Sequence, residues 1–215
     1  MKFQRSLILT SILAGLIGCH DNDKVKKPIP LEPSTPLVTL TGKVADGYIE
    51  NALVCIDKNN NSVCDNDEPQ AITDAQGTFT IPSLTQETID SFPLVAEISE
   101  NSKDTDTGDN FPSSLTFTAP SGYIFISPVT TMVQHLIELG DDKSAAEQTI
   151  QEKLSTDIHP NKDYIAVEND ETKEQSIRDD AKSLHSTAFI WTQLHISSRL
   201  KVFISQNLQE LCSTS

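Results

Sequence analysis

Apolar and polar residues alternate along much of the chain between residues 37 and 127, which is typical of half-buried β-strands. In LVTLTGKVA (37–45), Val38 and Leu40 alternate with polar residues. Similar patterns predict further strands within 48–56, 73–81, 92–99, 114–119 and 122–127. Six or seven short strands at these intervals predict an antiparallel β-sandwich over residues 37–126.

The apolar period lengthens to three or four residues after position 126, which predicts helices. Ser127 is expected to cap a helix that begins at Pro128 and ends at Gly140. A second helix is expected to open at Ser144 and a longer third one near Asp170. The predicted core-facing residues are Val129, Met132, Val133, Leu136, Ile137, Ala145, Ile150, Leu154, Ile177, Ala181, Leu184, Ala188, Trp191 and Leu194. The predicted fold class is therefore α+β, with a small helical region (127–215) after the sandwich.

The N-terminal residues 1–18 have the layout of a bacterial export signal. Two basic residues precede an apolar run that is too short to span a membrane as a helix. The ending LIGC resembles the lipobox of bacterial lipoproteins, which implies that Cys19 carries acyl chains such as palmitate and becomes the first mature residue. His20 stands where an inner-membrane retention signal would have Asp, which favours the outer membrane. An ordinary signal peptide with a chance cysteine is the alternative.

Residues 19–36 are expected to be a flexible, lipidated tether. The segment HDNDKVKKPIPLEPSTP (20–36) contains four prolines, several charges and few apolar residues. In extended form, at about 3 Å per residue, it would reach roughly 50 Å.

The charge balance excludes some partners. The chain has 16 basic and 31 acidic residues, and residues 1–18 contain two of the basic residues and no acid, so the mature chain carries a net charge of −17. Such a surface repels nucleic acid and anionic lipid headgroups and attracts divalent cations. It also fits an exported protein that simply stays soluble.

Three cysteines remain once Cys19 is lipidated. Cys55 and Cys64 are nine positions apart and are the natural disulfide pair in an oxidising compartment. Cys212 is left over. It fits a free thiol, a bridge between molecules, or a chain that stops short of its usual length.

The segment CIDKNNNSVCDNDE (55–68) is unusually rich in Asp and Asn, and its spacing matches a calcium-binding loop of the EF-hand type. Calcium prefers six to eight hard oxygen ligands, which carboxylates, amides and a backbone carbonyl supply. The predicted ligands, at positions 1, 3, 5, 7, 9 and 12 of the loop, are Asp57, Asn59, Asn61, Val63 (through its carbonyl), Asp65 and Glu68.

Two features depart from an EF-hand. Ser62 stands at position 6, where glycine normally allows a positive φ, so strain of about 1 kcal/mol is expected. The flanks are the β-run LVCI and Pro69 rather than helices. Because only three of the predicted ligands are anionic and Ser62 is strained, the expected calcium affinity is weak, with Kd of roughly 10⁻⁴ to 10⁻³ M. An asparagine-rich turn without metal is the alternative.

The stretch from Gly42 to Ile81 resembles the start of carboxypeptidase-regulatory-like and Sdr-type B-repeat β-sandwiches. The shared elements are GKVADG, the segment ALVCIDKNNN and TDAQGTF. The resemblance implies a transthyretin-like or immunoglobulin-like stalk or adhesive module that binds calcium and is not an enzyme.

Other candidate sites are weaker. The loop DTDTGD (104–109) offers Asp104, Asp106 and Asp109 to a second ion, although a solvated hairpin tip explains it better. His135, His185 and His195 lie on predicted helices without the spacing of a metal-ligand pair. We find no nucleophile elbow, phosphate-binding glycine loop or HExxH pattern, so no catalytic residue is expected.

The sequence thus favours a lipid-anchored cell-envelope protein of the outer membrane, facing the surface or the periplasm. Its expected role is that of a structural or adhesive surface module stabilised by calcium, with other envelope proteins or host-surface proteins as partners. The alternative is a periplasmic accessory subunit that helps a secretion or envelope complex assemble.

Overall fold

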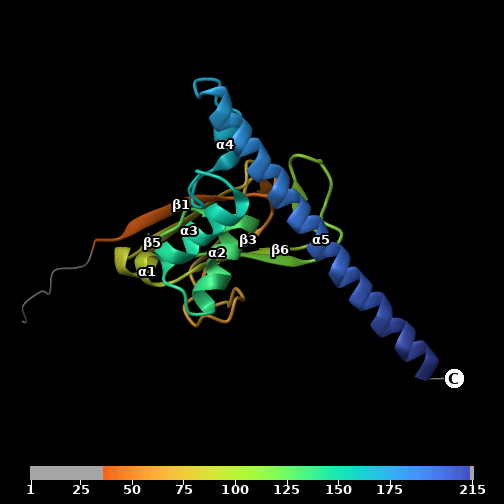
Figure 1. The fold of residues 1–215 in the computed structure, drawn as a ribbon. Coiled ribbons are helices and arrows are strands. Elements are labelled where there is room, and N and C mark those ends of the chain that lie inside the picture. Colours follow the sequence, from red (N-terminus) through yellow and green to blue (C-terminus); the bar gives the residue numbers. More distant parts are fainter. Residues whose placement is uncertain (1–35, 214–215) are drawn as a thin grey trace, which may run out of the picture. The chain divides into compact units, whose positions relative to one another are not determined.

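A computed structural model describes residues 36–213, of which residues 197–213 are described as helical backbone alone (Figure 1). The export signal (1–18), Cys19 and nearly all of the expected tether lie outside the described residues. The described chain is α+β, as expected, with its helices concentrated in the C-terminal half. Its strands are β1 (Val38–Val44), β2 (Ile49–Glu50), β3 (Leu53–Ile56), β4 (Gln70–Ile72), β5 (Thr78–Leu84), β6 (Leu94–Ile98), β7 (Lys103–Asp104), β8 (Leu115–Ala119) and β9 (Phe125–Ile126).

The strands form three sheets. The largest has the order β4-β3-β6-β8 and is antiparallel throughout; a second has the order β5-β1-β9, and β2 pairs with β7. Strand β9 runs parallel to β1, with Lys43 opposite Phe125 and Val44 opposite Ile126. The expectation of purely antiparallel pairing is therefore wrong at β9. Because the preceding strand β8 belongs to the other sheet, β9 reaches β1 by a crossover rather than a hairpin.

The strand expected at 48–56 is divided into β2 and β3, which belong to different sheets. The break is at Asn51, whose φ of 60° is left-handed and is better tolerated by Asn than by most residues. The buried Thr73 hydroxyl supports the break by donating to the Ile49 carbonyl (2.6 Å) and accepting from the Ala52 N–H (2.9 Å). A side chain twenty residues downstream thus interrupts an otherwise continuous apolar pattern.

One apolar core joins the two larger sheets. Strand β8 shows the alternation that predicted it: Leu115, Phe117 and Ala119 are buried, whereas Thr116 and Thr118 are half-exposed. Side chains of β1 and β5 pack in the same core as side chains of β3, β6 and β8. Its buried members include Leu40, Val44, Val54, Ile56, Phe79, Ile81, Leu94, Ala96 and Phe117.

The helices are α1 (Gln86–Ser91), α2 (Pro128–Glu138), α3 (Lys143–Leu154), α4 (Tyr164–Glu168) and α5 (Gln175–Ser213). Helix α2 begins as expected, with a capping box in which Ser127 and Thr130 exchange hydrogen bonds between side chain and backbone. Helix α3 begins one residue earlier than expected because Asp142, not Ser144, accepts from the Ala145 N–H (3.1 Å). Helices α1 and α4 were not anticipated.

Helix α5 begins at Gln175 rather than near Asp170. Its expected inward face is confirmed at Ala181, Leu184 and Ala188, which are buried. It is wrong at its ends, because Ile177 is 41% exposed and Leu194 is 65% exposed, while Thr192 and Ile196 are buried. The buried stripe continues from Ala188 in steps of four residues, as the helical period of 3.6 residues allows.

A second core lies among the helices. Tyr164 of α4 is fully buried and meets Phe125 of β9 edge to face, with ring centroids 5.2 Å apart. Within the described residues, no helix combines the length and apolar character needed to cross a membrane.

Candidate metal site

The candidate loop, residues 57–68, connects β3 to β4 and is closed at its base. The Ile56 N–H donates to the Pro69 carbonyl (3.0 Å), and the Asp57 N–H donates to the Pro93 carbonyl (3.0 Å). The predicted disulfide between Cys55 and Cys64 is present, with Cα atoms 5.5 Å apart. The loop is thereby fixed to β3 by the disulfide and to the segments that precede β4 and β6 by the two backbone hydrogen bonds.

Asp57, at position 1, is 1% exposed, and its carboxylate organises the turn. Its two oxygens accept hydrogen bonds from the backbone N–H groups of Asn61 (3.1 Å) and Ser62 (2.8 Å). The buried charge is thus met by donors within its own loop.

Asn59, Asn61 and Asp65, at positions 3, 5 and 9, converge. The side-chain amides of Asn59 and Asn61 both donate to the same oxygen, Oδ2 of Asp65, at 2.8 and 2.9 Å. Their own oxygens accept from backbone N–H groups two residues further on, Asn59 from Asn61 (3.1 Å) and Asn61 from Val63 (2.9 Å). Three of the predicted ligands therefore share one focus.

Glu68, at position 12, closes the loop from its C-terminal side. It is 7% exposed; its Oε1 accepts from the Lys58 N–H (2.6 Å) and its Oε2 from the Asp65 N–H (3.2 Å). Both carboxylate oxygens therefore face the loop backbone, and bidentate binding of an ion by Glu68 stays a prediction.

The backbone turns where the sequence requires it to turn. Ser62, at position 6, has a φ of 59°, and Asn60 has a φ of 56°. The positive φ predicted at position 6 is therefore adopted by serine in place of glycine, at a cost of about 1 kcal/mol. Val63 follows this turn with an exposed side chain, and the role of its carbonyl as a ligand stays a prediction.

Among the described residues, no group of three or more His, Cys, Asp or Glu side chains is arranged to hold a metal ion. The predicted set contains three such side chains, Asp57, Asp65 and Glu68, and in the structure they do not form a group of this kind. Calcium binding therefore stays a prediction for this loop.

The second acidic loop, 104–109, is only in part a solvated tip. Asp109 is exposed, but Asp104 is buried and its carboxylate accepts from the Asp106 N–H (2.9 Å). The side chains of Asp104 and Asp106 occupy the space that a Cβ atom on Gly47 would fill. This contact brings the loop to the turn that follows β1.

Asp46, beside Gly47, is 1% exposed, and no described residue makes a hydrogen bond with either of its carboxylate oxygens. The buried hydroxyls of Tyr164 and Thr192 are also without such a bond. The pKa of Asp46 is raised to about 7, chiefly by burial and to a smaller extent by the negative charges of Asp104 and Asp106. Asp46 is thus a buried acid close to its titration point at neutral pH.

His185 of α5 joins this region to α4. Its Nε2 lies 2.9 Å from Oδ2 of Asp106, and its Nδ1 lies 2.9 Å from Oε2 of Glu168. Both ring nitrogens can donate together only in the imidazolium form. The sequence reasoning missed this cluster, because its members come from four separate segments and no local spacing reveals them.

Comparison of the chain with models of protein families, with curated proteins and with solved structures found no match.

Proposed function

We propose that residues 57–68 bind one calcium ion, which stabilises a structural or adhesive module of a lipid-anchored outer-membrane protein. The observation that supports this proposal best is the convergence of Asn59 and Asn61 on Asp65, in a loop that also contains the buried carboxylates of Asp57 and Glu68. These are the residues that the sequence pattern selects.

The ligand set suits calcium in charge and in kind. Asp57, Asp65 and Glu68 supply three negative charges, and the two amides and the Val63 carbonyl supply neutral hard oxygens. The amide N–H groups that now reach Asp65 would be displaced by a cation. Rotation of each amide would then direct its oxygen to the ion, and it would break the hydrogen bonds that these oxygens now accept from the Asn61 and Val63 N–H groups.

We further interpret the two larger sheets as the layers of a sandwich of the transthyretin-like or immunoglobulin-like kind. The shared core of β1 and β5 with β3, β6 and β8 supports this interpretation. Lipidation of Cys19 would tether the module to the membrane. The role is binding or support, and the proposal includes no catalytic step.

Isothermal titration of residues 20–215 with calcium tests the metal proposal. We expect saturable binding of one ion with Kd of roughly 10⁻⁴ to 10⁻³ M. Asp65→Asn should weaken it at least tenfold, whereas the exposed Asp109→Asn is the matched control and should leave it unchanged. A wild-type titration without binding heat, and without protection of the loop from proteolysis, would contradict the proposal.

A periplasmic accessory subunit is the second candidate, and one observation favours it. On α5, Phe189 is 36%, Ile190 is 57% and Leu194 is 65% exposed, which gives this helix an apolar outer face suited to an assembly partner. Protease treatment of whole cells separates the two roles. A surface module is released by the protease, whereas a periplasmic subunit is spared until the outer membrane is opened.

A further inference from the structure

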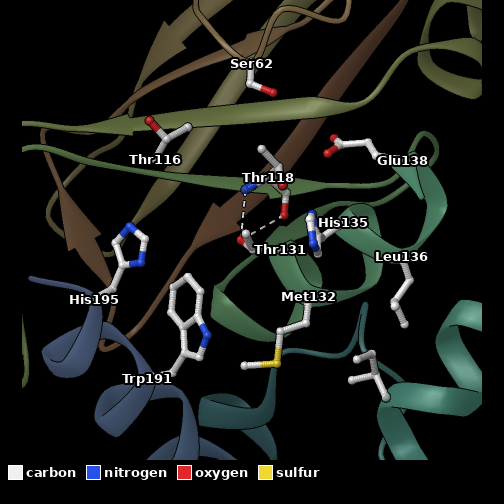
Figure 2. Close-up of a pocket in the computed structure, with 11 residues that line it drawn as sticks. Ser62, Thr116, Thr118, Thr131, Met132, His135, Leu136, Glu138, Trp191 and His195 are labelled. Carbon is white, nitrogen blue, oxygen red and sulfur yellow. Dashed lines mark hydrogen bonds between the residues drawn. The ribbon is translucent and has the colours of Figure 1, made fainter. Parts of the chain in front are cut away.

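A groove of about 710 Å³ lies between strand β8 and helices α2 and α5. Figure 2 shows Trp191 and His195 of α5 on one side, Met132, His135 and Leu136 of α2 on the other, and Thr116 and Thr118 of β8 along the top of the view. The Trp191 ring stacks on His195, with centroids 5.1 Å apart and planes 10° apart. The volume of the groove is that of a pocket for a small molecule or a few peptide residues.

The floor of the groove belongs to a sheet edge, because β8 is the last strand of the order β4-β3-β6-β8. The N–H of Thr118 donates to the Thr131 hydroxyl (3.0 Å), and its carbonyl accepts from the Thr130 hydroxyl (2.8 Å). Both main-chain groups of Thr118 therefore point away from β6. In an antiparallel ladder such outward residues recur every second position, so the main-chain groups of Thr116 point outward as well.

Thr116 differs from Thr118 in having no cap. No described residue outside β6 hydrogen-bonds to the main chain of Thr116, although Thr116 lines the groove. An outward N–H and C=O on one residue offer a partner backbone a pair of hydrogen bonds. This is the way in which extended peptides add to sheet edges.

The charge of the groove selects the sign of its ligand. An adjoining hollow of about 410 Å³ shares Ser62, Thr118 and Glu138 with it. Among the described residues that line the two, Glu138 presents an exposed carboxylate, Asp57 is buried, and none is a Lys or Arg. With a net charge of −15 for the whole chain, a second copy of this chain is a poor occupant and a basic partner is a good one.

We propose that this groove binds an extended, positively charged peptide segment of a partner protein. The segment pairs with the main chain of Thr116, places an apolar side chain against Met132 and Trp191, and directs a Lys or Arg toward Glu138. Such a groove would be an adhesive surface. It goes beyond the calcium proposal and does not depend on it, because β8, α2 and α5 provide the contacts.

The test uses the peptide acetyl-Lys-Val-Lys-Val-Lys-Val-amide as the probe, with the chain of residues 20–215. Trp191 is the single tryptophan of the chain, so its fluorescence reports occupation of this groove and of no other acidic surface. The titration is made in calcium and repeated in EDTA. A saturable change in Trp191 emission in either condition supports the proposal, and its absence in both overturns it.

Two matched peptides examine the mode of binding. The Glu-Val peptide of the same length has the wrong charge, and the Lys-Pro peptide has the right charge but lacks the N–H groups for strand pairing. Both should fail to bind. If either binds as tightly as the Lys-Val peptide, the proposed recognition is wrong.

Variants then locate the contact. Glu138→Gln should weaken the Lys-Val peptide about twofold to fivefold, as expected for a charge pair at the rim of a groove. The exposed Glu171→Gln is the matched control and should have no effect. Thr116→Pro removes only an outward N–H and should weaken binding further, provided that circular dichroism shows a native fold. Equal effects of Glu138→Gln and Glu171→Gln would refute the assignment of the site.

Discussion

The loop at 57–68 and the Asp46 cluster (Asp46, Asp104, Asp106, Glu168 and His185) are both rich in acidic residues. Their buried carboxylates, however, have opposite hydrogen-bonding environments. In the loop, Asp57 and Glu68 are buried, and each accepts two backbone hydrogen bonds from its own segment. Asp46 is equally buried and receives none from the described residues. The first arrangement meets its carboxylates with hydrogen-bond donors, whereas burial without such donors raises the pKa of Asp46 to about 7.

The two regions also differ in the sequence separation between the residues that contact one another. The side-chain hydrogen bonds of the predicted ligands are made within the loop, although the Asp57 N–H also reaches the Pro93 carbonyl. The cluster needs α4, α5 and the 104–109 loop to be packed in place, with His185 between Asp106 and Glu168. If the proposed calcium site is correct, the loop should respond to a ligand, whereas the raised pKa of Asp46 should make the second region respond to pH.

The largest effect is expected from the pH dependence of stability. Asp46 titrates near 3.8 when unfolded and at about 7 when folded, so the folded state holds the extra proton between these values. Stability is therefore lost as pH rises from about 4 to about 7, by at most roughly 4 kcal/mol for this group.

Asp46→Asn should remove most of that slope and stabilise the protein at pH 8, by about 1–3 kcal/mol. Urea denaturation at pH 5 and pH 8 measures it, with the exposed Asp109→Asn as control. The same pH slope in the Asp46→Asn variant and in the wild type would show that Asp46 is not the titrating group.

The disulfide gives the next largest effect. Replacing Cys55 and Cys64 together by Ser should lower the free energy of unfolding by about 2–3 kcal/mol, because the loop of the unfolded chain is no longer closed. Chemical denaturation measures the loss, and Cys212→Ser serves as control. The double replacement should also weaken calcium binding, since the bridge holds the middle of the loop to β3. Unaltered calcium affinity would show that the loop holds its shape without the bridge.

Calcium should stabilise the protein through the loop at 57–68, and this stabilisation should not depend on the Asp46 cluster. At a calcium concentration about tenfold above Kd, the gain in unfolding free energy is about 1.4 kcal/mol. Melting curves in calcium and in EDTA measure it, and Asp65→Asn should abolish the increment while Asp46→Asn retains it. If Asp46→Asn abolishes the calcium-dependent increment and Asp65→Asn does not, the ion does not bind at the loop.

The smallest effect concerns the turn at Ser62. Ser62→Gly relieves a left-handed serine and should gain about 0.5 kcal/mol in the calcium-bound state. Asn60→Gly is the matched control and should gain less, because Asn tolerates this conformation better. Calcium titration of both variants measures these two gains. A loss of affinity in Ser62→Gly would indicate that the serine side chain itself supports the site.

What could be predicted from the sequence follows the same division. The α+β class, the disulfide, the capping of α2 and the turn at Ser62 depend on neighbouring residues and were predicted. The break at Asn51 depends on Thr73, and the parallel β9 depends on the sheet to which β8 belongs. The contacts of His185 depend on Asp106 and Glu168, far away in sequence. None of these long-range contacts leaves a periodic signal.

Strand β1 is the central strand of its sheet, hydrogen-bonded to β5 on one side and to β9 on the other. In the proposed lipid-anchored protein, mechanical load from the membrane would enter the folded part at Val38, the first residue of this strand. The load would first meet the ladder with β5 alone, because the pairing with β9, which leads into α2 through Ser127, involves only Lys43 and Val44. Force on the anchor would therefore have to break the ladder with β5 before it reached the part of β1 that is paired on both sides.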